Sequence, residues 1–98
     1  HMNDVQGLLG LAAKARKLSF GDSGMKDIRA KKAKLVIMSA DIGENSHKKL
    51  VDKCTYYHVR YVYMDDDKMN MAIGQRNRKF IVILDEGFAQ KLHTCLKG

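Results

Sequence analysis

The order of apolar patterns in this sequence predicts an α/β domain with helices on both faces of a central sheet. Two short continuous apolar runs, KLVIMS at 34–39 and KFIVIL at 79–84, are typical of strands that are buried on both faces. Other segments space their apolar residues as amphipathic helices do. Strands that alternate with helices of about a dozen residues indicate a layered α/β architecture.

The N-terminal third is expected to contain a helix, a short strand and a second helix. Apolar residues recur at i, i+3, i+4, i+7 and i+8 between Asn3 and Lys17, which predicts an amphipathic helix capped by Asn3. Residues 18–21 are expected to form a short strand. Asp22 or Ser23 then has a side chain suited to cap the second helix.

The alternation of helices and strands continues towards the C-terminus. A third helix is predicted over 44–57, and the run VRYVYM at 59–64 follows it as a strand. A short helix begins within 65–74 and ends at Gly74, because glycine favours the position after a helix. Asp85 is expected to cap the last helix.

Length and composition predict a single domain over residues 3–98. The chain has 98 residues, 45% of them hydrophobic, and no proline, which suits one compact core. His1 and Met2 are interpreted as an expression scar. No run approaches the roughly 18 apolar residues of a membrane span, and the N-terminus lacks a signal-peptide pattern. We therefore expect a cytoplasmic protein without membrane contact, and we expect it to be a monomer.

The residue types of metal and catalytic sites are present, but their spacing does not indicate such a site. Cys54 and Cys95 lack the spacing of zinc ligands or of a disulfide framework and are interpreted as small core residues. The acidic run 65–67 lacks the spaced oxygen ligands of a calcium loop and lies where a helix start favours negative charge. No set of acid, base and nucleophile is recognisable. We expect no metal, no cofactor and no enzymatic activity.

The chain is strongly basic, which favours a polyanionic partner. Its 18 Lys and Arg residues outnumber its 11 Asp and Glu residues, for a formal net charge of +7. In a small chain such an excess favours nucleic acid first. A basic surface can also serve solubility alone, so the placement of the charges has to decide between these interpretations.

The turn FGDSGMK at 20–26 is the first candidate site. Gly21 lets the chain bend, and Asp22 and Ser23 carry short polar side chains. The helix that starts here directs free backbone N–H groups outward, and Lys26 on its first turn can place an ammonium group on a bound phosphate. An ordinary helix start has a similar composition, so this alternative stays open.

The basic loop GQRNRK at 74–79 is the second candidate site. Guanidinium groups suit phosphates and base edges, and an Asn amide can pair with a base. If the strands at 34–39 and 79–84 run parallel and close together, both loops open on one basic surface. The predicted RNA-binding residues are Gly21, Asp22, Ser23, Lys26, Arg29, Gly74, Gln75, Arg76, Asn77 and Arg78, with Lys14, Arg16 and Lys17 extending the positive area.

Three segments carry a family resemblance: LLGLAAKARKLSFG, IRAKKAKLVIMSADIGEN and MNMAIGQRNRKFIVILDEGFAQKL. Together they resemble the bacterial YlxQ-type proteins of the L-seven-Ae ribosomal protein family, which bind kink-turn RNA. The similarity extends from about Asp4 to Leu96. It implies a three-layer α-β-α sandwich around a mixed, mostly four-stranded sheet. It also implies a non-enzymatic RNA-binding function that involves ribosomal or other structured RNA.

The family's binding signature, Gly-x-Asn-Glu-x-x-Lys, lies at the start of the second helix. The resemblance implies that its Asn, Glu and Lys contact the sheared G·A pairs and the backbone of the kink. Lys26 matches the lysine and Gly21 lies at or next to the glycine, whereas Asp22 and Ser23 replace the Asn-Glu pair. The family's other contact loop is usually small and apolar, but here it is the basic GQRNR. Both departures are consistent with a shift towards phosphate-dominated or otherwise different RNA contacts.

Two other functions stay open at this point. A protein-interaction adaptor on the same fold is the alternative, and an exposed apolar patch near Met38, Met64, Met69 or Met71 would support it. An enzyme that acts on RNA or nucleotides is the third, and detectable turnover of RNA would support that function.

Overall fold

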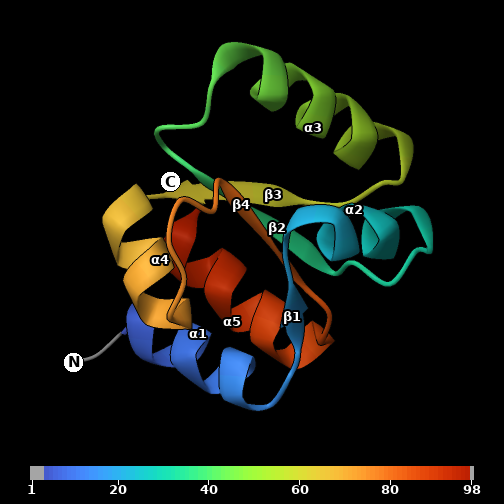
Figure 1. The fold of residues 1–98 in the computed structure, drawn as a ribbon. Helices are drawn as coiled ribbons and strands as arrows, with labels where there is room; N and C mark the ends of the chain where they lie inside the picture. The colour runs from blue at the N-terminus through green and yellow to red at the C-terminus, as the bar shows by residue number, and fades with distance from the viewer. Residues whose placement is uncertain (1–3, 98) are drawn as a thin grey trace.

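Residues 4–97, the part of the chain that the structure describes, form five helices and a four-stranded sheet in this computed structural model (Figure 1). None of these helices combines the length and the apolar content that a membrane span requires. In chain order the elements are α1 (Val5–Lys14), β1 (Leu18–Ser19), α2 (Gly21–Arg29), β2 (Leu35–Ser39), α3 (Glu44–Tyr56), β3 (Tyr61–Met64), α4 (Asp66–Ile73), β4 (Phe80–Ile83) and α5 (Glu86–Leu96).

The strand order is β1-β4-β2-β3, with β2 and β3 parallel and β4 antiparallel to both of its neighbours. The predicted mixed, four-stranded sheet is therefore confirmed, but β2 and β4 are antiparallel, so the parallel arrangement on which the joint basic surface was made conditional is not observed. The reason is the short path from β3 to β4, because α4 has only eight residues and loop 74–79 returns beside it. The chain thus enters β4 at the end of the sheet where it left β3.

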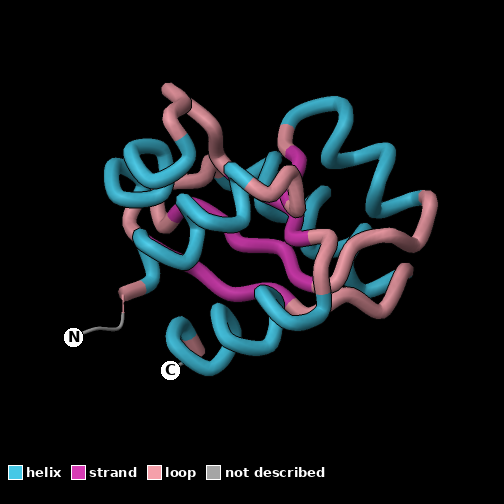
Figure 2. Tube along the Cα trace, turned by 90° about the horizontal axis from the view of Figure 1, so that it is seen from below, coloured by secondary structure: helices cyan, strands magenta, loops and turns pink. Residues whose placement is uncertain are grey.

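Helices cover both faces of the sheet, so the three-layer α-β-α sandwich is confirmed. α1, α4 and α5 lie against one face, and α2 and α3 lie against the other (Figure 1). The view from below in Figure 2 shows helices passing in front of the strands. Leu35 and Ile37 of β2 belong to the core under α1, α4 and α5, whereas Val36 and Met38 belong to the core under α2 and α3. All four side chains are fully buried, as predicted for this continuous apolar run.

The helix starts differ between the two faces. On one face, α1, α4 and α5 are each capped by an aspartate side chain that accepts a hydrogen bond from a backbone N–H of the first turn. These caps are Asp4, Asp65 and Asp85. Asn3, the cap predicted for α1, lies outside the described residues. On the other face, α2 follows Phe20 and α3 follows Gly43, and neither helix has a capping side-chain hydrogen bond.

The cap predicted for α2 at Asp22 or Ser23 is wrong, because this helix begins earlier. Phe20 is extended and packs against the core, and Gly21 turns the chain into the helix with a φ of 61°. Gly24 then faces the sheet so closely that an added Cβ would lie 3.2 Å from two side chains of β4. This orientation of the helix leaves Asp22 and Ser23 exposed in its first turn.

The two cysteines lie in different environments. Cys54 of α3 is fully buried, as predicted, and burial raises the pKa of its thiol to about 11. Cys95 is exposed, so the expectation of a core position is wrong for this residue. The buried stripe of α5 passes through Ala89 and Leu92, and with about 3.6 residues per turn Cys95 falls beside that stripe in the last turn.

We expect the two thiols to differ in reactivity. At about pH 8 a thiol reagent should modify Cys95 in the folded protein, whereas Cys54 should react only after unfolding, because modification requires an accessible thiolate. Cys95→Ser should abolish the fast phase and leave the unfolding-dependent phase in place. Two rapidly reacting thiols in the native protein would contradict the burial of Cys54.

Candidate nucleic-acid interface

Three chain segments meet at one end of the sheet. β1 and β2 end there and β4 begins there, because β4 is antiparallel to both. The backbone carbonyl of Lys79 accepts a hydrogen bond of 2.8 Å from the N–H of Ser39, which fixes the start of β4 beside the end of β2. The start of α2, the loop 40–43 before α3 and the loop 74–79 therefore lie together. The two predicted site segments are neighbours even though β2 and β4 run antiparallel rather than parallel.

A cavity of about 350 Å³ lies between these segments. It brings together three of the predicted site residues, Gly21, Asn77 and Arg78. Two more lining residues, Met25 and Lys79, lie within the two predicted segments. The others were not assigned to the site from sequence: Ile42, Ser46, Lys49, Leu50 and Phe80. The loop before α3 and the first half of α3 thus form a wall of the cavity.

The guanidinium of Arg78 is placed at the start of α2. Its Cζ atom lies 4.3 Å from the centroid of the Phe20 ring, which is a cation–π contact. Gly21 leaves room for this group, since an added Cβ would lie 2.8 Å from Nη1 of Arg78. Gln75 accepts a long hydrogen bond of 3.5 Å from Nε of the same side chain. A positive group therefore adjoins the first-turn N–H groups that no side chain caps.

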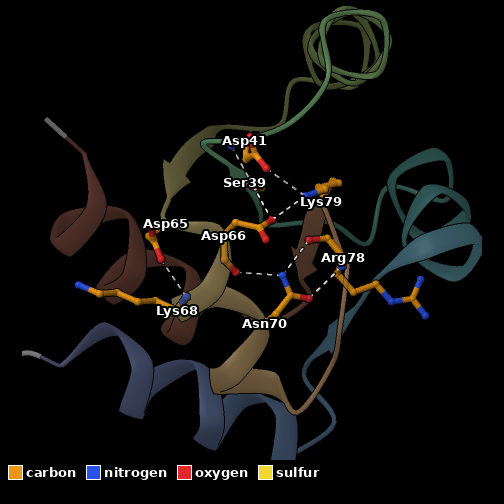
Figure 3. A network of polar contacts seen from close by, with 8 residues as sticks. All are labelled: Ser39, Asp41, Asp65, Asp66, Lys68, Asn70, Arg78 and Lys79. Carbon is orange, nitrogen blue, oxygen red and sulfur yellow. Dashed lines mark hydrogen bonds and ion pairs between the residues drawn. The ribbon is translucent and has the colours of Figure 1, made fainter.

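Asn70 of α4 holds the backbone of Arg78 in place (Figure 3). Its side-chain oxygen accepts a hydrogen bond of 2.9 Å from the Arg78 N–H, and its amide nitrogen donates to the Arg78 carbonyl at 3.0 Å. The same nitrogen donates to the carbonyl of Asp66 at 2.9 Å. Asn70 is only 6% exposed, so these bonds are shielded from water and costly to lose. Loop 74–79 is therefore fixed to the middle of α4.

Lys79 is held by neighbouring acids. Its Nζ lies 3.0 Å from Oδ1 of Asp66 and 3.5 Å from Oδ2 of Asp41, and Ser39 donates to the same Asp66 oxygen at 2.7 Å (Figure 3). Hydrogen bonds from Ser39 and Lys79 lower the pKa of Asp66, and the hydrogen bond to Asp66 raises the pKa of Lys79. The charge of Lys79 is thus balanced locally. Within residues 4–97, the two arginines of the same loop form no ion pair.

Two of the three residues in the acidic run 65–67 are engaged in contacts within the protein. Asp65 caps α4 by accepting a hydrogen bond from the N–H of Lys68, and Asp66 bonds to Ser39 and Lys79. Across the described chain, no group of three or more His, Cys, Asp or Glu side chains lies close enough to hold a metal ion.

The remaining predicted residues divide into a near group and a distant group. The exposed side chains of the near group, on the first half of α2 and on the loop, are Asp22, Ser23, Lys26 and Arg76. Gly74 ends α4 in the left-handed conformation. Arg29 is the last residue of α2, about 12 Å from Gly21 along the helix. The basic residues Lys14, Arg16 and Lys17 at the end of α1 are distant from this site. The carbonyl of Lys17 accepts a hydrogen bond from the N–H of Leu84, which follows β4. This basic end of α1 therefore lies at the opposite end of β4 and does not extend the site.

The wall formed by α3 is difficult to find from sequence. Gly43 precedes α3 without a capping side chain, and Lys49 follows within the helix, which is a weak signal for an anion site. The α3 wall belongs to the site only because β2 lies beside β4, and no local sequence pattern indicates this pairing between distant segments.

The methionines do not form an exposed patch in the described part of the chain. Met38, Met64 and Met69 are buried, and only Met71 is exposed, to 74%. These residues therefore do not form the exposed apolar patch that would support a protein-interaction adaptor.

Comparison with known proteins identifies the family. The sequence model of the ribosomal protein L7Ae/L30e/S12e/Gadd45 family matches residues 3–93. The chain belongs to this family. It is 42% identical over 91 residues to the RNA-binding protein YlxQ of Bacillus subtilis (strain 168), with 91% of each chain covered. It is 39% identical over 93 residues to the RNA-binding protein YlxQ of Enterococcus faecium, which covers 93% of this chain and 89% of that relative. The resemblance inferred from sequence is confirmed.

Solved structures of the family's fold agree with this assignment. A protein of unknown function from Bacillus halodurans C superposes with a TM-score of 0.87 at 36% identity, over 95% of this chain and 96% of that chain. The Giardia lamblia 15.5kD RNA binding protein superposes with a TM-score of 0.75 at 18% identity, over 98% of this chain and 91% of that chain. The second similarity shows a shared fold.

We expect loop 74–79 to depend on Asn70. Asn70→Ala leaves the N–H and the carbonyl of Arg78 without buried partners, and each such loss costs about 1–3 kcal/mol, so the free energy of unfolding should fall by about 2–6 kcal/mol. Hydrogen exchange at the Arg78 amide should accelerate in the same variant. Urea denaturation and exchange measurements test both effects. The exposed neighbour supplies the control, since Met71→Ala should change stability by less than about 0.5 kcal/mol. Unchanged exchange at Arg78 would show that Asn70 does not hold the loop.

Proposed function

We propose that this chain is a non-enzymatic protein that binds structured RNA through the interface between the start of α2 and loop 74–79. The observation that carries the proposal is the guanidinium of Arg78 beside a helix start that no side chain caps. Phosphate oxygens can accept hydrogen bonds from both groups. The relatives from two bacteria are named RNA-binding proteins, and the formal charge of +7 also favours a polyanion.

The parts of the interface have separate roles in this proposal. Lys26 and Arg76 are exposed and contact phosphates. Asn77 lines the cavity, where its amide can pair with a base edge. Met25 and Ile42 supply an apolar wall against which the face of an unpaired base can pack.

Within the proposal, the target is ribosomal or kink-turn-like RNA, and the chain acts as a monomer in the cytoplasm. Membership of a family described by its ribosomal proteins supports this target. Asp22 and Ser23 stand where the family signature has Asn and Glu, and both are exposed. Contacts to phosphates should therefore outweigh contacts to the G·A edges, with a weaker preference for the kink than the full signature would give.

The test of this proposal is binding to a standard kink-turn RNA and to the same RNA with its tandem G·A pairs replaced, across a salt series. We expect both RNAs to bind with a steep salt dependence and the intact kink to bind modestly better. Arg76→Ala combined with Arg78→Ala should weaken binding to both RNAs. It should also reduce the slope of log K against log salt by about 1–2, since each lost phosphate contact removes about 0.7–0.9.

A second double variant controls for charge alone in this test. Lys68→Ala combined with Lys91→Ala removes the same charge from exposed positions on α4 and α5, which cover the opposite face of the sheet. This variant should keep a slope close to that of the unmodified protein. Failure of the unmodified protein to bind either RNA, or equal losses in the two double variants, would overturn the proposal.

Substitutions at two glycines distinguish the effect of backbone strain from the effect of displacing the Arg78 side chain. Gly21 and Gly74 have φ values of 61° and 67°, so alanine at either position should cost about 1–2 kcal/mol of stability in urea denaturation. Only Gly21→Ala also places a Cβ 2.8 Å from the Arg78 guanidinium, whereas nothing lies within 4 Å of a Cβ at Gly74. We expect only Gly21→Ala to weaken RNA binding several-fold. Equal binding by the two variants would show that the position of this guanidinium is unimportant.

A further inference from the structure

A groove between α2 and α3 continues from the interface cavity towards the far ends of both helices. A second depression, of about 630 Å³, shares Met25 and Lys49 with that cavity and follows α3 to Tyr56 and Tyr57. A third depression lies between these tyrosines and Lys31, where α2 and α3 have ended. Shared lining residues join the three into one surface, which we call the α2–α3 groove.

The groove has a direction and a length. α2 and α3 lie on the same face of the sheet (Figure 1), and both begin beside the interface cavity, which Gly21 and Ser46 line. The segment of α3 from Ser46 to Tyr56 spans about 15 Å at about 1.5 Å per residue. A nucleic-acid strand advances about 3.4 Å per nucleotide when its bases are stacked. The groove therefore has the length of about four nucleotides.

The walls of the groove are predominantly basic. Lys49 lines both the interface cavity and the groove, and beyond the cavity the groove is lined by Lys31, Lys53 and His58. Among the described residues that line the groove, the one carboxylate is Asp52, and Lys48 lies 3.0 Å from it. The lysines near the helix ends also offset the partial negative charge of the helix C-termini. The groove is thus suited to a negatively charged strand.

Tyr56 presents an aromatic ring at the far end of this basic groove. Its side chain is 75% exposed, although large apolar groups are usually covered. The ring packs edge-on against Tyr57, with centroids 4.8 Å apart and an angle of 78° between the planes. Tyr57 in turn packs against the core under α2 and α3. Tyr56 is therefore supported from beneath and has surface free for stacking.

We infer that the α2–α3 groove binds a single-stranded segment of the RNA, which leaves the interface and stacks a base on Tyr56. The inference rests on the proposed function, because RNA bound at the start of α2 enters this groove directly. Lys49 and Lys53 contact its phosphates while the tyrosine contacts a base face, the combination that binds single strands with little sequence preference. Stacking requires an unpaired base, so the segment is single-stranded.

The experiment compares the kink-turn RNA with versions that carry a single-stranded tail of about six adenosines at either end, enough to fill a groove about four nucleotides long. For the unmodified protein, one of the two tails should tighten binding about tenfold, an effect typical of one stacked base. Tyr56→Ala combined with Lys53→Ala should abolish this gain and leave the affinity for the tail-less RNA unchanged, because neither residue lines the interface cavity. Tyr56→Phe should keep the gain, since its ring still stacks. The Lys68→Ala and Lys91→Ala variant should keep it too.

The outcomes separate this inference from the function on which it rests. If the tail-less RNA binds and neither tail adds affinity, the groove inference is overturned and the proposed function stands. If no folded RNA binds, the next measurement is binding of free oligoadenylate. Binding that is lost in Tyr56→Ala supports the groove inference but not the proposed function, whereas no binding of oligoadenylate overturns both. If polyglutamate competes for the groove as well as oligoadenylate of equal charge does, the occupant is an acidic polypeptide and the inference is wrong.

Discussion

The position of β4 between β1 and β2, antiparallel to both, is the constraint on which the candidate interface depends. It places the first residues of β4 beside the last residues of two strands, and those strands lead into α2 and into the loop before α3. With β4 reversed, loop 74–79 would open at the other end of the sheet, beside the basic end of α1. The antiparallel register thus assembles one cavity from three segments that are distant in sequence.

A short polar network makes this chain path stable and gives two neighbouring cations different roles. Asn70 satisfies both backbone groups of Arg78, so the loop can turn back along α4 without burying unpaired peptide groups. Asp66 and Asp41 balance Lys79, while the side chain of Arg78 leaves the backbone in another direction (Figure 3). One cation therefore stabilises the turn, and the next lies on the Phe20 ring at the start of α2.

Local patterns predicted most of the fold because they depend on local physics. The two buried runs, the left-handed Gly74 and the Asp85 cap all follow from residue type and spacing, and all are observed. The errors about the α2 cap and the basic end of α1 arise from contacts between distant segments, whereas the error about Cys95 concerns its position around α5. The close approach of Gly24 to β4 sets the orientation of α2 and exposes the expected caps. Likewise both predicted loops line the cavity, but the wall from α3 and the remoteness of the Lys17 region depend on strand pairing that no local pattern specifies.

The contrast between the two helical layers bears on which face meets a ligand. The three helices of one layer are each closed by an aspartate, and a capping side chain is worth about 1 kcal/mol. The two helices of the other layer forgo that contribution, and both start at the same cavity. Each of these helices carries a carboxylate in its first turn, Asp22 in α2 and Glu44 in α3, but neither helix start has a capping side-chain hydrogen bond. The uncapped N–H donors and the adjacent guanidinium of Arg78 therefore favour a bound anion, whereas the two first-turn carboxylates oppose it, and the balance between them depends on which groups an approaching phosphate contacts.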